Sequence, residues 1–207
     1  MCRVRFIVVA SMSLLCGCGP RRDERVIPPT LDADAVATAV MAKVDVNRDG
    51  LITQNEMQAL PALAPARMEL DSDKNGALSK AELRRWLEFV RDSGVALSQL
   101  TGVVVHLHKP LANAAVTLLP EPLMGPGVAT ATAVTDAEGR FAATIPGSRY
   151  PGVHCGFYRV EIKGIGNDGK SLNRFQGDNT PLGLAVGGML PVGGVVTFTL
   201  DETTSRP

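Results

Sequence analysis

The chain has 207 residues, enough for one or two ordinary domains, and 45% of them are hydrophobic, which suffices for real cores. Its 21 basic residues balance 21 acidic ones, so the charge gives no sign of a nucleic-acid-binding protein. Aromatic residues make up only 4%, which argues against a surface that stacks on bases or sugars.

Residues 1–18 have the pattern of an export signal. Two arginines precede an apolar run at residues 6–15, which is too short to span a bilayer. The segment ends in Leu-Cys-Gly-Cys at residues 15–18, which resembles a bacterial lipobox, and Gly17 in front of Cys18 marks Cys18 as the lipidated residue. The alternative is an ordinary secretory signal. The resemblance implies an exported bacterial lipoprotein, anchored to a membrane by its N-terminal lipid and facing the periplasm or the cell surface.

Residues 19–30 are charged and contain prolines without any apolar period, and they predict a flexible tether. Two cysteines, Cys2 and Cys16, would leave with the signal, and a third would carry the lipid. Cys155 is then the single remaining thiol, so the mature chain has no intrachain disulfide. We expect Cys155 to be a loop or half-buried thiol rather than a nucleophile.

Helical spacing begins near Leu31 or Asp32 and leads into a twelve-residue segment rich in oxygen-bearing side chains, residues 45–56. A second segment, residues 71–82, has the same spacing, D-x-N/D-x-D/N-G-x5-E. Ca²⁺ takes six to eight hard oxygen ligands, which such alternating side chains supply, and a glutamate at the twelfth position supplies two at once. A glycine at the sixth position permits the sharp turn of the loop.

This pattern resembles the calcium loops of EF-hand proteins, and the resemblance covers residues 31–93 with both loops complete. It implies two Ca²⁺ sites, and the alternative is a pair of acidic turns that bind no metal. The expected ligands are Asp45, Asn47, Asp49, the carbonyl of Leu51 and Glu56 in the first loop, and Asp71, Asp73, Asn75, the carbonyl of Ala77 and Glu82 in the second.

Two further positions of each loop support the interpretation. Ile52 and Leu78 are eighth, where paired loops join through a short two-stranded contact and bury an apolar side chain. Thr53 and Ser79 are ninth, where a hydroxyl can hold a ligating water.

The helices between the two loops must be short. Only 14 residues separate Glu56 from Asp71, so each helix there should have one or two turns, which leaves little groove for a target helix. A longer helix follows the second loop and should end near Gly94. Its expected core-facing residues are Leu83, Trp86, Leu87 and Val90.

From Leu100 onward the apolar period changes to two, which is typical of β-strands. About seven short strands in a hundred residues predict a β-sandwich. His106 and His108 fall on one face of the first strand, and we expect them to be solvated rather than to bind a metal. The predicted strands cover residues 103–108, 115–119, 129–135, 140–145, 157–163 and 195–200, with a weaker one at 182–186.

Several short motifs of this region follow an order found in another family. They are Gly102-Val103-Val104, Lys109-Pro110-Leu111-Ala112-Asn113, Thr135-Asp136, Gly139-Arg140-Phe141 and Gly156-Phe157-Tyr158-Arg159-Val160. Their order resembles a carboxypeptidase regulatory-like, transthyretin-like domain over residues 99–201, which implies a non-catalytic Greek-key sandwich. The residues themselves predict turns at Pro110 and at Gly139, where a tight hairpin closes, and a left-handed conformation at Asn113.

The predicted fold is α+β in two domains, an all-α EF-hand pair followed by an all-β sandwich. The expected divisions are a signal at 1–18, a tether at 19–30, the EF-hand pair at 31–93, a linker at 94–99, the sandwich at 100–201 and a tail at 202–207. The linker is expected to be either a hinge or a short rigid joint.

The function expected from the sequence is that of a non-enzymatic, lipid-anchored, calcium-binding envelope or surface protein, because no catalytic residue set is recognisable. Its expected partners are the membrane, through the lipid, and a protein or glycan, but no nucleic acid. A dockerin-like docking module and a carbohydrate-binding module are the alternatives. Dockerin loops usually close with aspartate, whereas Glu56 and Glu82 close these loops, and the scarcity of aromatic residues disfavours a sugar-binding surface.

Overall fold

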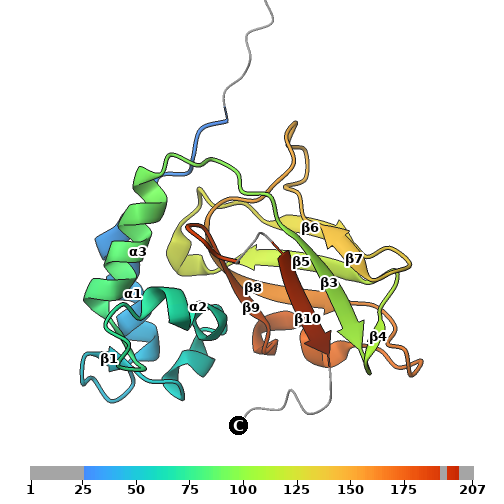
Figure 1. Ribbon diagram of the computed structural model, residues 1–207, viewed down its shortest axis with the longest axis horizontal. Coiled ribbons are helices and arrows are strands. Elements are labelled where there is room, and N and C mark those ends of the chain that lie inside the picture. Colours follow the sequence, from blue (N-terminus) through green and yellow to red (C-terminus); the bar gives the residue numbers. More distant parts are fainter. Residues whose placement is uncertain (1–25, 192–194, 201–207) are drawn as a thin grey trace, which may run out of the picture.

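The computed structural model describes residues 26–191 and 195–200. The predicted signal at 1–18 with Cys18, most of the tether and the tail at 202–207 lie outside the described residues. In the described part the chain is mixed α+β, and a helical half precedes a β half that is built from two sheets (Figure 1).

The helical half begins where the sequence predicts. Asp32 caps the first helix, and its Oδ1 accepts a hydrogen bond from the Ala35 N–H at 3.0 Å. The elements between the two loops are short, as the spacing of the loops requires. The elements are α1 (Ala33–Val44), β1 (Leu51–Ile52), the 3₁₀ helix η1 (Glu56–Ala59), α2 (Leu63–Leu70), β2 (Leu78–Ser79) and α3 (Lys80–Asp92).

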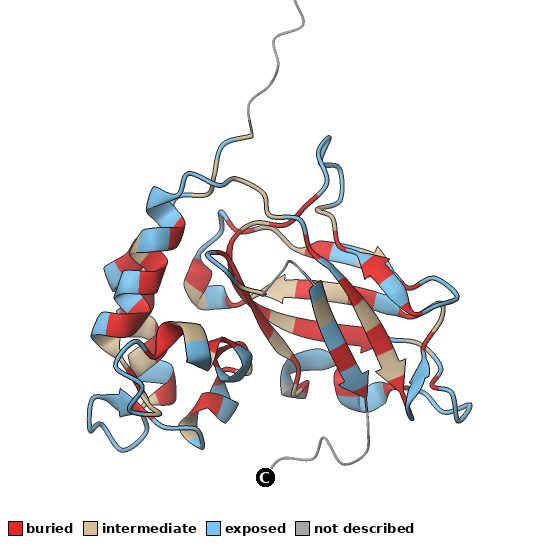
Figure 2. Cartoon of the chain, viewed as in Figure 1, coloured by how far each residue is buried: buried red, intermediate tan, exposed pale blue. Residues whose placement is uncertain are grey.

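The core of this half contains the residues that the apolar pattern selected. Ile52 and Leu78 face each other across the β1–β2 pair, and both side chains are fully buried. The predicted stripe of α3 is buried as well, which confirms its assignment to the core. Figure 2 shows the buried bands of α3 alternating with exposed ones, as expected for a helix that packs on one side.

The β half consists of two four-stranded sheets. One has the order β10–β3–β4 with β7 also paired to β3, and the other has the order β6–β5–β8–β9. Among the described residues β10 pairs with β3 in parallel, and the other named pairs are antiparallel. The strands are β3 (Thr101–His106), β4 (Lys109–Pro110), β5 (Ala115–Pro120), β6 (Ala131–Val134), β7 (Arg140–Ala142), β8 (Gly156–Lys163), β9 (Gly183–Val186) and β10 (Val195–Leu200), and the 3₁₀ helices are η2 (Pro122–Met124), η3 (Asn173–Phe175) and η4 (Gly177–Asn179).

The end of the first strand differs from the prediction. Strand β3 stops at His106, and Leu107 and His108 form a two-residue turn with φ of 51° and 60° into β4. The turn therefore precedes Pro110 instead of starting there, and His108 does not lie on the strand. The left-handed conformation at Asn113 is confirmed by its φ of 56°.

The tight hairpin predicted at Gly139 is present: the Asp136 N–H donates to the Arg140 carbonyl at 2.9 Å, and Thr132 and Thr144 exchange two backbone hydrogen bonds, at 2.8 and 3.0 Å. Gly139 has φ of 72°, and its N–H donates to the Asp136 carbonyl at 3.0 Å. The strands on either side, β6 and β7, belong to different sheets, since β6 pairs with β5 and β7 pairs with β3. Phe141 is buried as predicted, and its ring stacks on Phe198 at a centroid distance of 6.0 Å.

The two halves share one contiguous core. Trp86 of α3 stacks on Phe157 of β8, with ring centroids 5.0 Å apart. Strand β9 approaches the residues just before α2 so closely that a Cβ at Gly183 would clash with the backbone of Ala62. A further contact between the halves is the ion pair of Lys43 Nζ of α1 with the buried Glu121, at 2.9 Å.

The linker at 94–99 is tied to the β half. Ser98 and Val153 exchange two backbone hydrogen bonds, at 2.8 and 2.9 Å, and Gly94 turns the chain out of α3 with φ of 64°. These bonds tie Ser98 to the β half, and whether the segment is a hinge or a rigid joint stays open. The division into two domains and the Greek-key connection stay predictions.

Candidate metal centre

The two acidic loops occupy equivalent positions between helices. Asp45 follows α1, and its N–H donates to the Met41 carbonyl at 3.0 Å. Asp71 follows α2 in the same way, and its N–H donates to the Arg67 carbonyl at 2.8 Å. Each loop therefore starts from a helix terminus whose last backbone bonds fix the position of the first aspartate.

The backbone of the two loops coils in the same way. The fourth residues, Arg48 and Lys74, have φ of 61° and 60°, and the sixth residues, Gly50 and Gly76, have φ of 85° and 88°. Glycine adopts this left-handed region without a Cβ penalty, which is why both loops need it at the sixth position.

Oxygens at the third and fifth positions accept hydrogen bonds from the backbone two residues later. Asn47 Oδ1 accepts from the Asp49 N–H at 3.0 Å, and Asp49 Oδ1 accepts from the Leu51 N–H at 2.9 Å. Asp73 and Asn75 make the same bonds in the second loop. Turns of this kind also occur in acidic loops without a metal, so they do not decide between the two interpretations.

A buried oxygen of the first loop tests whether these residues suit a cation. Asp45 Oδ2 accepts from the Gly50 N–H at 3.0 Å, but Asp45 Oδ1 is buried and accepts a hydrogen bond from no described residue. A carboxylate oxygen that has lost its water without gaining a donor is costly. A hard cation in the coil of the loop would satisfy it, so the donor set fits Ca²⁺.

The carboxylates of the second loop converge. Asp71, Asp73 and Glu82 each offer an oxygen, and these three atoms lie within 4.8 Å of one another. Asp71 Oδ2 also accepts from the Gly76 N–H at 2.8 Å, which fixes the first of them. Among the described residues this is the one cluster of three or more acidic, histidine or cysteine side chains with metal-ligand spacing. Like charges so close repel each other unless a cation neutralises them.

Glu82 is held in place by both ends of its loop. Its Oε1 accepts from the N–H and the hydroxyl of Ser72 at 2.9 and 3.0 Å, and its Oε2 accepts from the N–H and the hydroxyl of Ser79 at 2.9 Å each. Burial alone would raise the pKa of Glu82, but the hydrogen bonds from Ser79 and Ser72 outweigh it and lower the pKa from 4.5 to about 2. The side chain is therefore an anion at neutral pH.

Glu56 has fewer contacts. Its Oε2 accepts from the N–H and the hydroxyl of Thr53 at 2.9 and 2.7 Å, and its Oε1 accepts from the Val46 N–H at 3.2 Å. The hydrogen bonds from Thr53 lower the pKa of Glu56 as well. The hydroxyls of Thr53 and Ser79, which we expected to hold ligating waters, thus donate to the twelfth residue of each loop in this structure.

The remaining predicted ligands are carbonyl groups at the seventh positions. Leu51 belongs to β1 and Ala77 directly precedes β2, so the β1–β2 pair fixes the backbone of both loops at this point. The sequence interpretation missed two residues of the second loop region. Ser72, at the second position, contacts Glu82, and Arg85 of α3 donates from Nη2 to Ser72 Oγ at 2.7 Å. The spacing of Arg85, three residues after Glu82 on a helix, was the available signal.

His106 and His154 accept backbone hydrogen bonds, and the free Cys155 is buried. His106 is buried, and its Nδ1 accepts from the Asn167 N–H at 2.9 Å, so the expectation of a solvated His106 is wrong. His154 Nδ1 accepts from the Ala129 N–H at 3.0 Å. Cys155 lies in the loop directly before β8, as one of its two expected positions has it, but it is buried rather than half-buried, and burial raises the pKa of its thiol.

Residues 38–61 and 68–87 match a family model described as EF hand. Each matched segment contains one of the two acidic loops. The match bears out the EF-hand prediction for this part of the chain and supports calcium binding by it.

One solved structure with some similarity is a variant of the major pilin subunit of Bacillus cereus, which is 14% identical with a TM-score of 0.32. The alignment covers 51% of this chain and 29% of the pilin, so the chain spans less than a third of that protein's length. No curated protein matches the chain. Within the described ranges, none of the helices combines the length and the apolar character that crossing a membrane requires.

Proposed function

We propose that this chain is a non-enzymatic calcium-binding protein in which Ca²⁺ acts as a structural clip that holds the helical half together and against the β half. The observation that carries the proposal is the position of the second loop. This loop joins α2 to α3, and both helices contact the sheet that contains β8 and β9. From α2, Glu69 Oε1 accepts at 3.1 Å from the N–H of Met189, in the turn that follows β9, and from α3 Trp86 stacks on Phe157 of β8.

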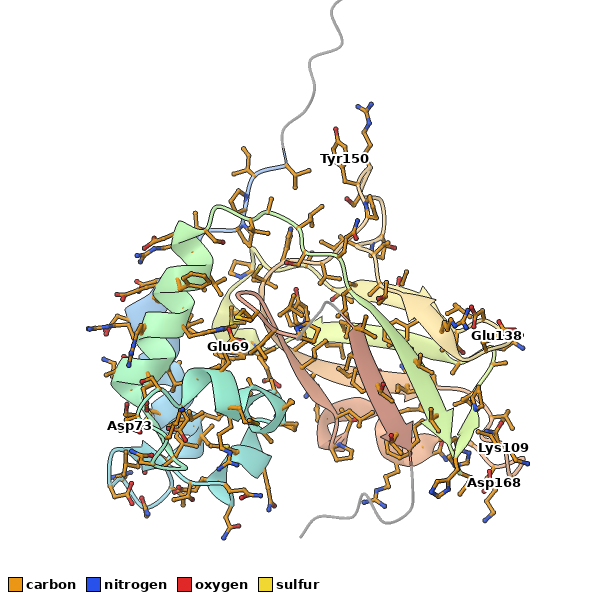
Figure 3. All side chains as sticks on the ribbon, in the orientation of Figure 1. Glu69, Asp73, Lys109, Glu138, Tyr150 and Asp168 are labelled. Atoms are coloured by element: carbon orange, nitrogen blue, oxygen red, sulfur yellow. The ribbon has the colours of Figure 1, made fainter. Side chains whose placement is uncertain are left out.

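The arrangement of the labelled side chains supports this interpretation. Glu69 lies where the helices meet the sheets, and Asp73 lies in the loop on the outer side of the helical half (Figure 3). A cation among the oxygens of the second loop would fix the angle between α2 and α3 from the outside, while the sheet contacts them from the inside. The loop and the sheet therefore constrain the same pair of helices.

The helical half needs such a constraint. Helix α2 has 8 residues and η1 has 4, and helices of this length are not stable alone in water. The convergent carboxylates of the second loop add repulsion that a cation would remove. We propose two Ca²⁺ sites, held by the side chains of the first, third, fifth and twelfth residues of each loop and by the carbonyls of Leu51 and Ala77.

A structural role fits better than a sensing role. A calcium sensor exposes an apolar groove when its helices open. Here the apolar side of the helical half is covered by the chain's own sheet, because Ala62, Trp86 and Val90 are buried close to β8, β9 and Gly187. Opening would break the stack of Trp86 on Phe157.

The proposed location is the bacterial envelope, with the chain anchored by lipid at Cys18. Exported proteins meet millimolar calcium more often than cytosolic ones, so sites with dissociation constants of about 10⁻⁴–10⁻³ M would be filled there. Weak sites are therefore compatible with a permanent structural clip.

Hydrogen exchange tests the clip. Removing Ca²⁺ with a chelator should speed exchange of the backbone amides in β8 and β9 as well as in the loops, because both helices that contact this sheet would loosen. Strands β7 and β10 of the other sheet serve as the comparison. If the loops respond and β8 and β9 do not, the clip is confined to the helical half and the proposal fails.

Changing Cys18 to alanine tests the anchor. The variant should give an unprocessed precursor and lose labelling by a palmitate analogue, because the acyl chain has no other thiol in the expected position. Cys16→Ala is the matched control and should keep the label. Labelling that persists in Cys18→Ala and disappears in Cys16→Ala would place the lipid on Cys16 instead.

A further inference from the structure

The two loops have the same backbone coil but treat their twelfth residue differently. Glu82 is 4% exposed, and four donor groups from Ser72 and Ser79 contact its two oxygens. Glu56 is only partly buried, and backbone N–H groups alone reach its Oε1 among the described residues: Val46 donates at 3.2 Å, and the backbone of Asn47 also helps to lower the pKa of Glu56. The difference arises at the second position of each loop.

Ser72 occupies this position in the second loop and links Glu82 to a cation of the protein itself. The Ser72 hydroxyl has one hydrogen, which it donates to Glu82 Oε1, and its oxygen accepts from Arg85 Nη2 at 2.7 Å. Arg85 thus orients the hydroxyl that orients the carboxylate. In the first loop Val46 has no hydroxyl and is 78% exposed, and the residue that corresponds to Arg85 is Ala59.

The second loop, which has the Arg85–Ser72–Glu82 hydrogen bonds, is also the loop whose carboxylates lie close together. Glu82 lies with Asp71 and Asp73 within 4.8 Å, whereas the acidic residues of the first loop form no such group among the residues that the structure describes. Because the hydrogen bonds already hold the Glu82 carboxylate close to those of Asp71 and Asp73, Glu82 loses little further rotamer freedom when it binds an ion.

We infer that Ser72 and Arg85 are positioning residues that make the second loop the tighter calcium site, which fills before the first. This inference rests on the proposed calcium function. Residues that hold a metal ligand from behind typically change metal affinity by about 10- to 100-fold when they are removed. The second loop should therefore bind Ca²⁺ at least about tenfold more tightly than the first.

The test is a calcium titration of the full chain followed by NMR, with the Gly50 and Gly76 amide signals as separate reporters of the two loops. In the wild type the Gly76 signal should change at lower calcium than the Gly50 signal. Ser72→Val, which installs the residue of the first loop, should shift the Gly76 midpoint at least about tenfold upward and leave the Gly50 midpoint in place. Val46→Ser is the reciprocal change. Because Ala59 occupies the position that corresponds to Arg85, no arginine orients the new hydroxyl, and this variant should lower the Gly50 midpoint by a smaller factor than Ser72→Val raises the Gly76 midpoint.

Two further variants separate positioning from general structure. Ser72→Thr keeps the hydroxyl and should keep the wild-type order of filling. Arg85→Gln changes an exposed residue and should leave the fold intact. Like Ser72→Val, it should raise the calcium concentration at the midpoint of the Gly76 signal change. Equal midpoints in the wild type, or an unchanged Gly76 midpoint in both Ser72→Val and Arg85→Gln, would overturn the inference. Signals that do not respond even at saturating calcium would instead overturn the proposed function itself.

Discussion

Changing Glu56 and Glu82 together to glutamine is expected to abolish the stabilisation of this chain by Ca²⁺. The twelfth residue supplies two oxygens to the ion, and glutamine offers one neutral oxygen in place of two charged ones. At a calcium concentration one hundred times the dissociation constant, the lost free energy of unfolding would be about 2.7 kcal/mol per site. The measurement is the melting temperature of each protein with calcium and with chelator, and the double variant should melt at one temperature under both conditions.

The single variants measure the contribution of each loop, and a glutamate outside the loops serves as the matched control. Glu82→Gln should remove more of the calcium effect than Glu56→Gln, because Glu82 belongs to the convergent cluster. Glu88 of α3 lies on the same helix and forms a partly exposed ion pair with Arg84 at 3.6 Å. Glu88→Gln should leave the calcium effect intact. A double variant that calcium still stabilises as strongly as the wild type would show that the loops are not the binding sites.

The second large effect is expected at the contact between the two halves. Phe157 of β8 is fully buried against Trp86, and replacing a buried phenylalanine by alanine typically destabilises a protein by about 3–5 kcal/mol. If the sheet and the calcium loops constrain the same helices, the change must also weaken calcium binding, because coupling between two equilibria is reciprocal. We expect Phe157→Leu, a milder change that keeps the chain folded, to weaken calcium affinity by roughly fivefold or more.

The matched control for this contact is Phe89→Ala. Phe89 lies on α3 but is 59% exposed, so its loss should change stability by no more than about 0.5 kcal/mol and should leave calcium affinity unchanged. Calorimetric titration of both variants measures the affinities. A Phe157→Leu protein that is less stable but binds calcium as the wild type does would show that the two halves fold side by side without coupling.

Local features of the fold could be predicted from the sequence because they depend on residues close together in the chain. The start of α1 at the Asp32 cap, the short inner helices and the burial of Ile52 and Leu78 all follow from spacing within one loop or between the two neighbouring loops. Each predicted strand overlaps an observed one, since the period of two marks a pleated segment wherever it lies.

The features that sequence reasoning missed depend on contacts between distant segments. The parallel pairing of β10 with β3, the close approach of Gly183 to Ala62 and the burial of His106 under Asn167 are each decided by a partner at least 60 residues away. A histidine in a strand pattern is compatible with either face, and only the position of the 166–169 turn decides between them. The alternation along β3 therefore could not show that His106 is buried.

The ligand pattern was visible in the sequence, but the difference between the loops was not. Val46 and Ser72 are both second in their loops, and the calcium pattern accepts any residue at this position, so the pattern does not distinguish them. Only the three-dimensional contact with Glu82 and Arg85 gives Ser72 a role.

The most direct test of the calcium account is calorimetric titration of the full-length wild-type protein with Ca²⁺, combined with melting curves in calcium and in chelator. Two calcium sites should give heat from two binding events, the stronger assigned to the second loop, and a higher melting temperature in calcium. An absence of binding heat together with identical melting curves in calcium and chelator would contradict it.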